Sequence, residues 1–127
     1  MSKNQRFLLC NRCGNVAVLT VAKGGILTCC GEEMCELAPN TVEASQEKHL
    51  PVVEKTDDGI KVKVGGVSHP MQAEHFIDFI YVKTERGGQR IKLEIDDSPE
   101  AEFRFANDKP TEVYAYCNLH GLWKTEI

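Results

Sequence analysis

The chain has 127 residues and a net charge of −4, and its composition is 42% hydrophobic and 27% charged. These values fit a soluble globular protein of one domain, or of a very small domain joined to a medium one. The acidic balance argues against nucleic acid as a partner, because phosphate binding requires a basic face. No apolar run approaches the ~20 residues of a membrane span, and the N-terminus lacks the apolar core of a signal peptide, so we expect a cytoplasmic protein.

The first 36 residues contain five of the six cysteines. The runs FLLC (7–10), VAVLTV (16–21) and ILTC (26–29), with Gly24-Gly25 before the last, predict short strands joined by tight turns. So short a segment buries too little apolar surface to fold unaided, and we expect a metal or a partner subunit to stabilise it. We therefore predict a separate small domain over residues 1–36.

Residues 37–49 are predicted to form a linker and a loop that carries Glu47, Lys48 and His49. From residue 50 onward, short runs that alternate between apolar and polar residues dominate the sequence. These runs are GIKVKVG (59–65), FIDFIYVKT (76–84), RIKLEI (90–95), AEFRFA (101–106) and EVYAYC (112–117). Because they show no helical periodicity and are bounded by turn residues, they predict a small antiparallel β-sandwich over residues 50–127 and an all-β protein.

The motifs CNRCG and TCCG supply four cysteines, at positions Cys10, Cys13, Cys29 and Cys30. Four thiolates from two turns form a tetrahedral site that suits zinc or a single iron. Disulfides are the alternative for an even number of cysteines, but they are less expected without a secretion signal. A zinc ion that only stabilises the fold also stays open. Cys35 is either a replacement ligand, in a Cys29-x5-Cys35 pair, or a free thiol without an assigned role.

All four histidines lie in the second part of the chain, next to the ends of predicted strands. They are His49, His69, His75 and His120. Cys117 precedes His120 by three residues, and this spacing lets one turn aim both side chains at a common point, as metal sites require. A lone histidine is more often a surface or core residue, so the spacing alone leaves a site of four histidines and one cysteine open.

The motifs EKHLP (47–51), SHPMQAEHFI (68–77) and CNLHGLW (117–123), following CNRC and CC, resemble desulfoferrodoxin, the two-iron form of superoxide reductase. The resemblance implies a desulforedoxin-like first domain with an iron bound by the four cysteines, and an immunoglobulin-like sandwich with a second iron. It implies that His49, His69 and His75 bind the second iron through Nε, His120 through Nδ, and Cys117 as the axial thiolate. One position on this iron is expected to stay open.

The resemblance also implies the reaction, which is one-electron reduction of superoxide to hydrogen peroxide at the ferrous second site. An external donor such as rubredoxin returns the electron, and the protein is expected to be a homodimer. Ferrous iron with four neutral imidazoles and one thiolate is a net cation that attracts superoxide, whereas four thiolates make the first site a net anion. Lys48 is expected to attract superoxide and Glu47 to bind the oxidised iron; the alternative is a solvated charged pair.

Two other functions remain compatible with the residues alone. One is a non-catalytic, rubredoxin-like electron carrier, in which the second part of the chain only binds a partner. The other is a structural zinc protein that serves as an interaction module. Visible spectra and metal analysis distinguish the three hypotheses, because only the zinc protein is colourless and only the reductase reacts with superoxide.

Overall fold

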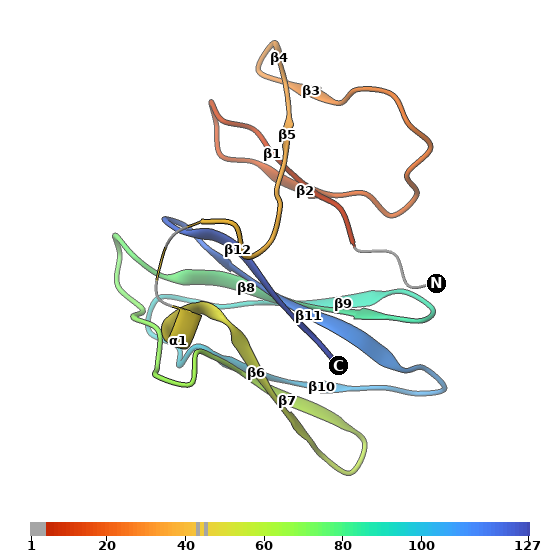
Figure 1. Ribbon diagram of the computed structural model, residues 1–127, viewed down its shortest axis with the longest axis vertical. Helices are drawn as coiled ribbons and strands as arrows, with labels where there is room; N and C mark the ends of the chain where they lie inside the picture. The colour runs from red at the N-terminus through yellow and green to blue at the C-terminus, as the bar shows by residue number, and fades with distance from the viewer. Residues whose placement is uncertain (1–4, 43, 45) are drawn as a thin grey trace. The chain divides into compact units, whose positions relative to one another are not determined.

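The computed structural model describes residues 5–42, 44 and 46–127 (Figure 1). The chain divides into two compact units, Met1–Ala38 and Pro39–Ile127. Strands make up nearly all of the regular structure in the described part of the chain, beside one short helix, α1 (Gln46–His49). The prediction of an all-β protein is therefore confirmed. Within the described residues, no helix is long and apolar enough to cross a membrane.

The first unit contains a three-stranded antiparallel sheet and a short hairpin. In the sheet, β1 (Phe7–Leu9) lies between β2 (Val16–Val18) and β5 (Cys35–Glu36). The hairpin pairs β3 (Thr28–Cys29) with β4 (Glu32–Glu33). The cysteine motifs lie where strands end, since Cys10 follows β1 and Cys30 follows β3. Cys10, Cys13 and Cys30 therefore lie outside the strands, and Cys29 is the last residue of β3.

The second unit is a sandwich of two antiparallel sheets, which Figure 1 shows as two layers. One sheet has the order β10-β7-β6 and the other the order β12-β11-β8-β9. Their bounds are β6 Pro51–Lys55, β7 Gly59–Val64, β8 Ile77–Thr84, β9 Gly88–Lys92, β10 Glu100–Arg104, β11 Pro110–Cys117 and β12 Gly121–Glu126. The predicted β-sandwich is thus confirmed.

Alternate residues of both sheets fill the space between the layers. The fully buried members include Ile60, Val62 and Val64 of β7 and Val113, Ala115 and Cys117 of β11. This arrangement follows from the two-residue period of a strand, which sends every second side chain to the same face. Because Cys117 is itself a core residue, the packing of the sandwich fixes the position of a predicted metal ligand.

Three elements of the second unit were not predicted as regular structure. Strand β6 is an edge strand with mostly exposed residues, so its sequence PVVEK shows no clear alternation. In β12 the adjacent residues Leu122 and Trp123 are both buried, which hides the two-residue period. Helix α1 is a single turn, closed by a hydrogen bond from Leu50 N to Gln46 O (3.0 Å), and lies within the predicted linker and loop.

The ends of several strands meet at one end of the sandwich. Figure 1 shows α1, the connection between β7 and β8, and the turn between β11 and β12 at this end. These three segments carry the four histidines, and Cys117 is the last residue of β11 beside them. The topology therefore gathers residues that are far apart in the sequence.

Candidate metal centres

The first candidate centre consists of the sulfur atoms of Cys10, Cys13, Cys29 and Cys30, which all lie within 4.8 Å of one another. The Sγ atoms of Cys13 and Cys29 are 3.6 Å apart, and those of Cys29 and Cys30 are 4.0 Å apart. Tetrahedral metal–sulfur bonds of about 2.3 Å place sulfur atoms about 3.8 Å apart. The four cysteines therefore fit a single metal ion. Cys35 lies outside this group, and its Sγ accepts a hydrogen bond from Asn11 Nδ2 (2.9 Å).

Local backbone geometry forms this first centre. The N–H of Cys13 donates to Cys10 Sγ (3.5 Å), and Cys30 adopts a left-handed φ of 53° directly after Cys29. The Cys13 N–H is the main cause that lowers the pKa of Cys10 to about 6, whereas the thiols of Cys13 and Cys10 raise the pKa of Cys30 to about 12. Without a metal the four thiols thus do not all ionise near neutral pH. A bound cation would stabilise them together as thiolates.

The second candidate centre brings together all five ligands that the resemblance implies. The donor atoms of His49, His69, His75 and Cys117 lie within 4.8 Å of one another. The Nδ1 of His120 is 3.1 Å from His49 Nε2 and 3.9 Å from Cys117 Sγ. The donors therefore converge on one point, although the residues span positions 49 to 120.

The four imidazole rings form a closed ring around that point. Neighbouring ring centroids are 4.6 to 5.0 Å apart around the order His49, His69, His75, His120. The centroids of His49 and His75 are 6.2 Å apart, which places these two rings opposite each other. The closest nitrogen pairs, at 3.1 and 3.2 Å, match the separation of about 3.0 Å expected for metal–nitrogen bonds of about 2.1 Å at right angles.

The chemistry of the donor atoms also fits a metal. The Nε2 of His75 is buried and has no hydrogen-bond partner among the residues that the structure describes. Such orphaned polar atoms are rare in folded proteins and call for a partner such as an ion. Imidazole nitrogens with one thiolate are a suitable set for iron. The residues therefore fit the second iron implied by the sequence.

Hydrogen bonds and stacking orient the histidine rings. His69 Nδ1 lies 2.7 Å from Pro70 O, and a carbonyl only accepts, so the proton is on Nδ1 and Nε2 is free to bind a metal. Burial lowers the pKa of His69 to about 4, which keeps the ring neutral. His49 stacks on Trp123 with a centroid distance of 4.9 Å, and Trp123 Nε1 donates to His120 O (3.1 Å). Trp123 was not predicted as a site residue, although it ends the CNLHGLW motif.

Cys117 ends β11 and is fully buried. Burial raises the pKa of its thiol, because a thiolate is poorly solvated there, while the backbone N–H groups of His120 and Leu119 act in the opposite direction. The N–H of His120 lies 3.4 Å from the sulfur. The turn after β11 therefore supplies both the neighbouring ligand and N–H groups that stabilise the thiolate.

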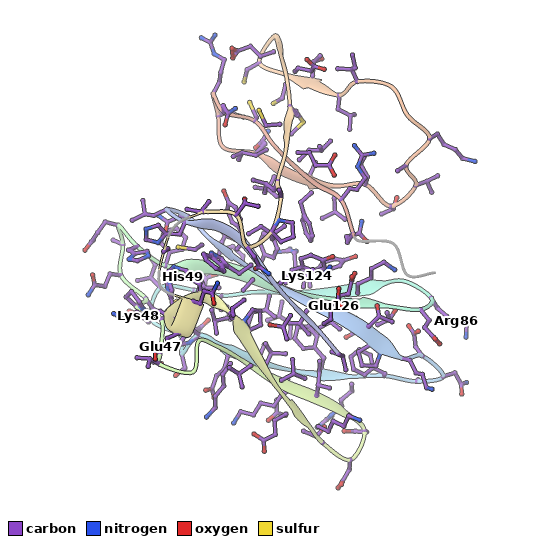
Figure 2. The ribbon with its side chains drawn as sticks, in the orientation of Figure 1. Glu47, Lys48, His49, Arg86, Lys124 and Glu126 are labelled. Atoms are coloured by element: carbon purple, nitrogen blue, oxygen red, sulfur yellow. The ribbon has the colours of Figure 1, made fainter. Side chains whose placement is uncertain are left out.

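Glu47 and Lys48 are exposed and precede His49 in α1, as Figure 2 shows. The N–H of Val67 donates to Glu47 O (3.0 Å), which ties α1 to the connection between β7 and β8. Burial is the main cause that lowers the pKa of His75, and the Lys48 ammonium acts in the same direction. The Lys48 ammonium is therefore close enough to the second centre to act on it electrostatically.

Comparison with known proteins gives concordant matches. The family model described as Desulfoferrodoxin matches residues 41–126. A desulfoferrodoxin of Syntrophotalea carbinolica is 45% identical over 126 residues, which cover 99% of each chain. The crystal structure of the superoxide reductase from Treponema pallidum has a TM-score of 0.83 at 36% identity, covering 98% of this chain and 100% of that one. The superoxide reductase from Nanoarchaeum equitans has a TM-score of 0.52 at 30% identity and covers 66% of this chain and 94% of its own.

Proposed function

The chain belongs to the desulfoferrodoxin family, and we propose that it is a superoxide reductase that converts superoxide, one electron and two protons into hydrogen peroxide. The observation that carries this function is the convergence of four imidazole nitrogens and the buried Cys117 sulfur on one point. An iron ion held by these five ligands would supply the electron. The four cysteines of the first centre would hold the other of the two irons that the family binds.

The protein's own residues assign the reaction to the second centre. Its donor set contains four neutral rings and a single thiolate, so a ferrous site there keeps a net positive charge that attracts superoxide. The first centre has four thiolates, whose combined charge repels an anion. Its four sulfur atoms also complete a tetrahedral shell and leave no place for a substrate.

We infer that Lys48 guides superoxide to the second centre and that Glu47 acts on the oxidised state. Support for Lys48 comes from its exposed position and from its electrostatic effect on His75. Because the protein has a net charge of −4, an anion gains nothing from the overall charge and requires a local cation. Glu47 is next to Lys48 and exposed, so its carboxylate is available as a ligand after a change of rotamer.

We further propose a rubredoxin-like protein as the electron donor, since each turnover consumes one electron. Cys13 and Cys30 are exposed, which would allow the first centre to exchange electrons with such a protein.

Val21 and Ile26 of the first unit are 67% and 71% exposed, and we propose that they contribute to a homodimer. The free cysteines fit a reducing compartment, and we propose the cytoplasm.

The proposed function is tested by pulse radiolysis of the reduced, iron-loaded protein. A reductase consumes superoxide stoichiometrically and yields one hydrogen peroxide per superoxide without releasing oxygen, whereas dismutation would release oxygen. A coloured protein that ignores superoxide would be an electron carrier instead. A colourless protein that contains zinc would be a structural module.

A further inference from the structure

Asn118 lies in the turn between β11 and β12, directly after Cys117 and two residues before His120. Its exposed side chain reaches a different segment of the chain, residues 74–76. The Nδ2 group donates to Glu74 O (3.1 Å), and Oδ1 accepts from Phe76 N (2.8 Å). The backbone N–H of Asn118 also donates to Phe76 O (3.2 Å). One residue therefore makes three hydrogen bonds to the segment around His75.

These bonds fix both peptide groups that flank His75. In the preceding peptide group, Glu74 O accepts from Asn118, and His75 N donates to Gln72 O (3.1 Å). In the following one, His75 O accepts from Gln72 N (2.9 Å), and Phe76 N donates to Asn118. Each peptide plane is thus held at both ends, once by Gln72 and once by Asn118. The direction in which the His75 side chain leaves the backbone is set by these four bonds.

His75 depends on this backbone arrangement because of where it lies. The regular pairing of β11 with β8 becomes irregular between Tyr116 and Cys117 and ends at the pair Cys117–Ile77. Beyond this point the bonds of Asn118 continue the connection between the two segments. Within the described part of the chain, the buried Nε2 of His75 has no hydrogen-bond partner, so no such bond to a described residue holds the metal-facing end of the ring.

We propose that Asn118 is a positioning residue that holds His75 at a fixed distance from Cys117 and His120, and that it thereby slows the loss of metal from the second centre. This inference rests on the metal site of the proposed function and not on its reaction with superoxide. Neighbours of ligating residues typically change metal affinity by about 10- to 100-fold when they are mutated.

Asn40 offers a matched control. It is also exposed, and its side chain makes the same pair of bonds to a strand, with Nδ2 donating to Lys124 O (3.1 Å) and Oδ1 accepting from Lys124 N (2.8 Å). These bonds end on Lys124 of β12, four residues after His120, and not on the peptide groups next to a histidine ligand. Asn40 also has a left-handed φ of 62°, so Asn40→Ala adds backbone strain and lowers the stability of the protein.

The test compares wild type, Asn118→Ala, Asn118→Asp and Asn40→Ala, each loaded with iron at both centres. The rate of iron loss to an excess of chelator is followed separately for each centre by visible absorption, and the melting temperature of each metal-free protein is measured. Asn118→Asp retains an acceptor for Phe76 N–H but loses the donor to Glu74 O.

We expect Asn118→Ala to lose second-centre iron about 10- to 100-fold faster than wild type, with an unchanged rate at the first centre. Asn118→Asp should lie between the two, and Asn40→Ala should keep the wild-type rate despite its lower melting temperature. Wild-type rates for both Asn118 variants, or an equal acceleration in Asn40→Ala, would overturn the inference and leave the proposed function intact. A wild-type protein without metal at the second centre would overturn both.

Discussion

The two metal centres differ in how much of the fold each requires. The first takes its ligands from two short segments within residues 10–30, and Cys13 and Cys30 are exposed to solvent. The second joins His49 to His120, 71 positions along the chain, and includes the buried core residue Cys117. A centre of the first kind follows from local turns alone. A centre of the second kind exists only when the sandwich is complete, and its single thiolate among four imidazoles would leave a net positive charge on a ferrous ion.

The largest expected effect comes from removing the thiolate of the second centre. Because replacing a neighbour of a metal ligand already costs about 10- to 100-fold, we expect Cys117→Ser to slow the reaction with superoxide by more than about 100-fold. The thiolate-to-iron absorption band should disappear, since an alcohol is a poor donor. Cys35→Ser is the matched control, because Cys35 lies outside both centres. If Cys117→Ser kept both the band and the rate, Cys117 would not be a ligand.

A smaller effect is expected from the charge that distinguishes the second centre. Lys48→Ile should slow the second-order reaction with superoxide by at least about 10-fold at low salt and reduce its dependence on ionic strength, because local steering changes association rates by about 10- to 10³-fold. Both iron spectra should stay unchanged. The exposed lysine of β7 provides the control, and Lys63→Ile should react at the wild-type rate. Equal rates for Lys48→Ile and wild type at low salt would make Lys48 a solvated bystander.

Glu47→Ala is expected to distinguish the role of Glu47 from that of Lys48, its neighbour in α1. The encounter with superoxide should proceed at least at the wild-type rate, because the carboxylate repels an anion and its removal cannot slow the approach. The spectrum of the oxidised protein at alkaline pH should change, because the proposed ligand of that state is absent. An unchanged spectrum across the pH range would assign Glu47 to the solvent-exposed surface alone.

A smaller effect on the superoxide reaction than that of Lys48→Ile is expected from a change at Gly65, which directly follows β7 and lies against the backbone of α1. Gly65 has a φ of 87°, and a Cβ there would lie 2.7 Å from Lys48 O and 2.8 Å from Glu47 O, besides overlapping Val67 O. Gly65→Ala should therefore destabilise the second unit by about 1–3 kcal/mol. It should also displace α1, slow the superoxide reaction by a few-fold and leave the absorption of the first centre unchanged. Gly87→Ala is the control, because its Cβ would meet nothing within 4 Å.

The contrast between the centres also explains what the sequence could predict. Strands β7, β8 and β11 were predicted from the alternation of apolar and polar residues in their sequences, although only β7 buries strictly alternate residues and β8 and β11 also bury adjacent ones. Strand β12 was missed because its sequence GLWKTE places the buried Leu122 and Trp123 side by side and has no such alternation. The four cysteines were grouped by their short spacing alone. The histidine site was expected only through a family resemblance, because no local period relates His49 to His120.

Residues that act through backbone contacts were not accessible from the sequence. Asn118 bonds to the main chain of residues 74–76, and Trp123 stacks on His49 and bonds to the carbonyl of His120. Such contacts depend on which turns the sandwich brings together, and an isolated Asn or Trp carries no pattern that names its partner. The resemblance motif CNLHGLW contains both residues but does not assign them a role.

The most direct test of the division between the centres is pulse radiolysis of Cys13→Ser, with the iron content of each centre measured beforehand. This variant should lose the colour of the first centre, because three thiolates do not complete its shell. With the second centre loaded, it should consume superoxide within about twofold of the wild-type rate, because the second centre takes no ligand from the first unit. Loss of the fast reaction in a folded Cys13→Ser protein that retains the second iron would contradict the assignment of the chemistry to the second centre.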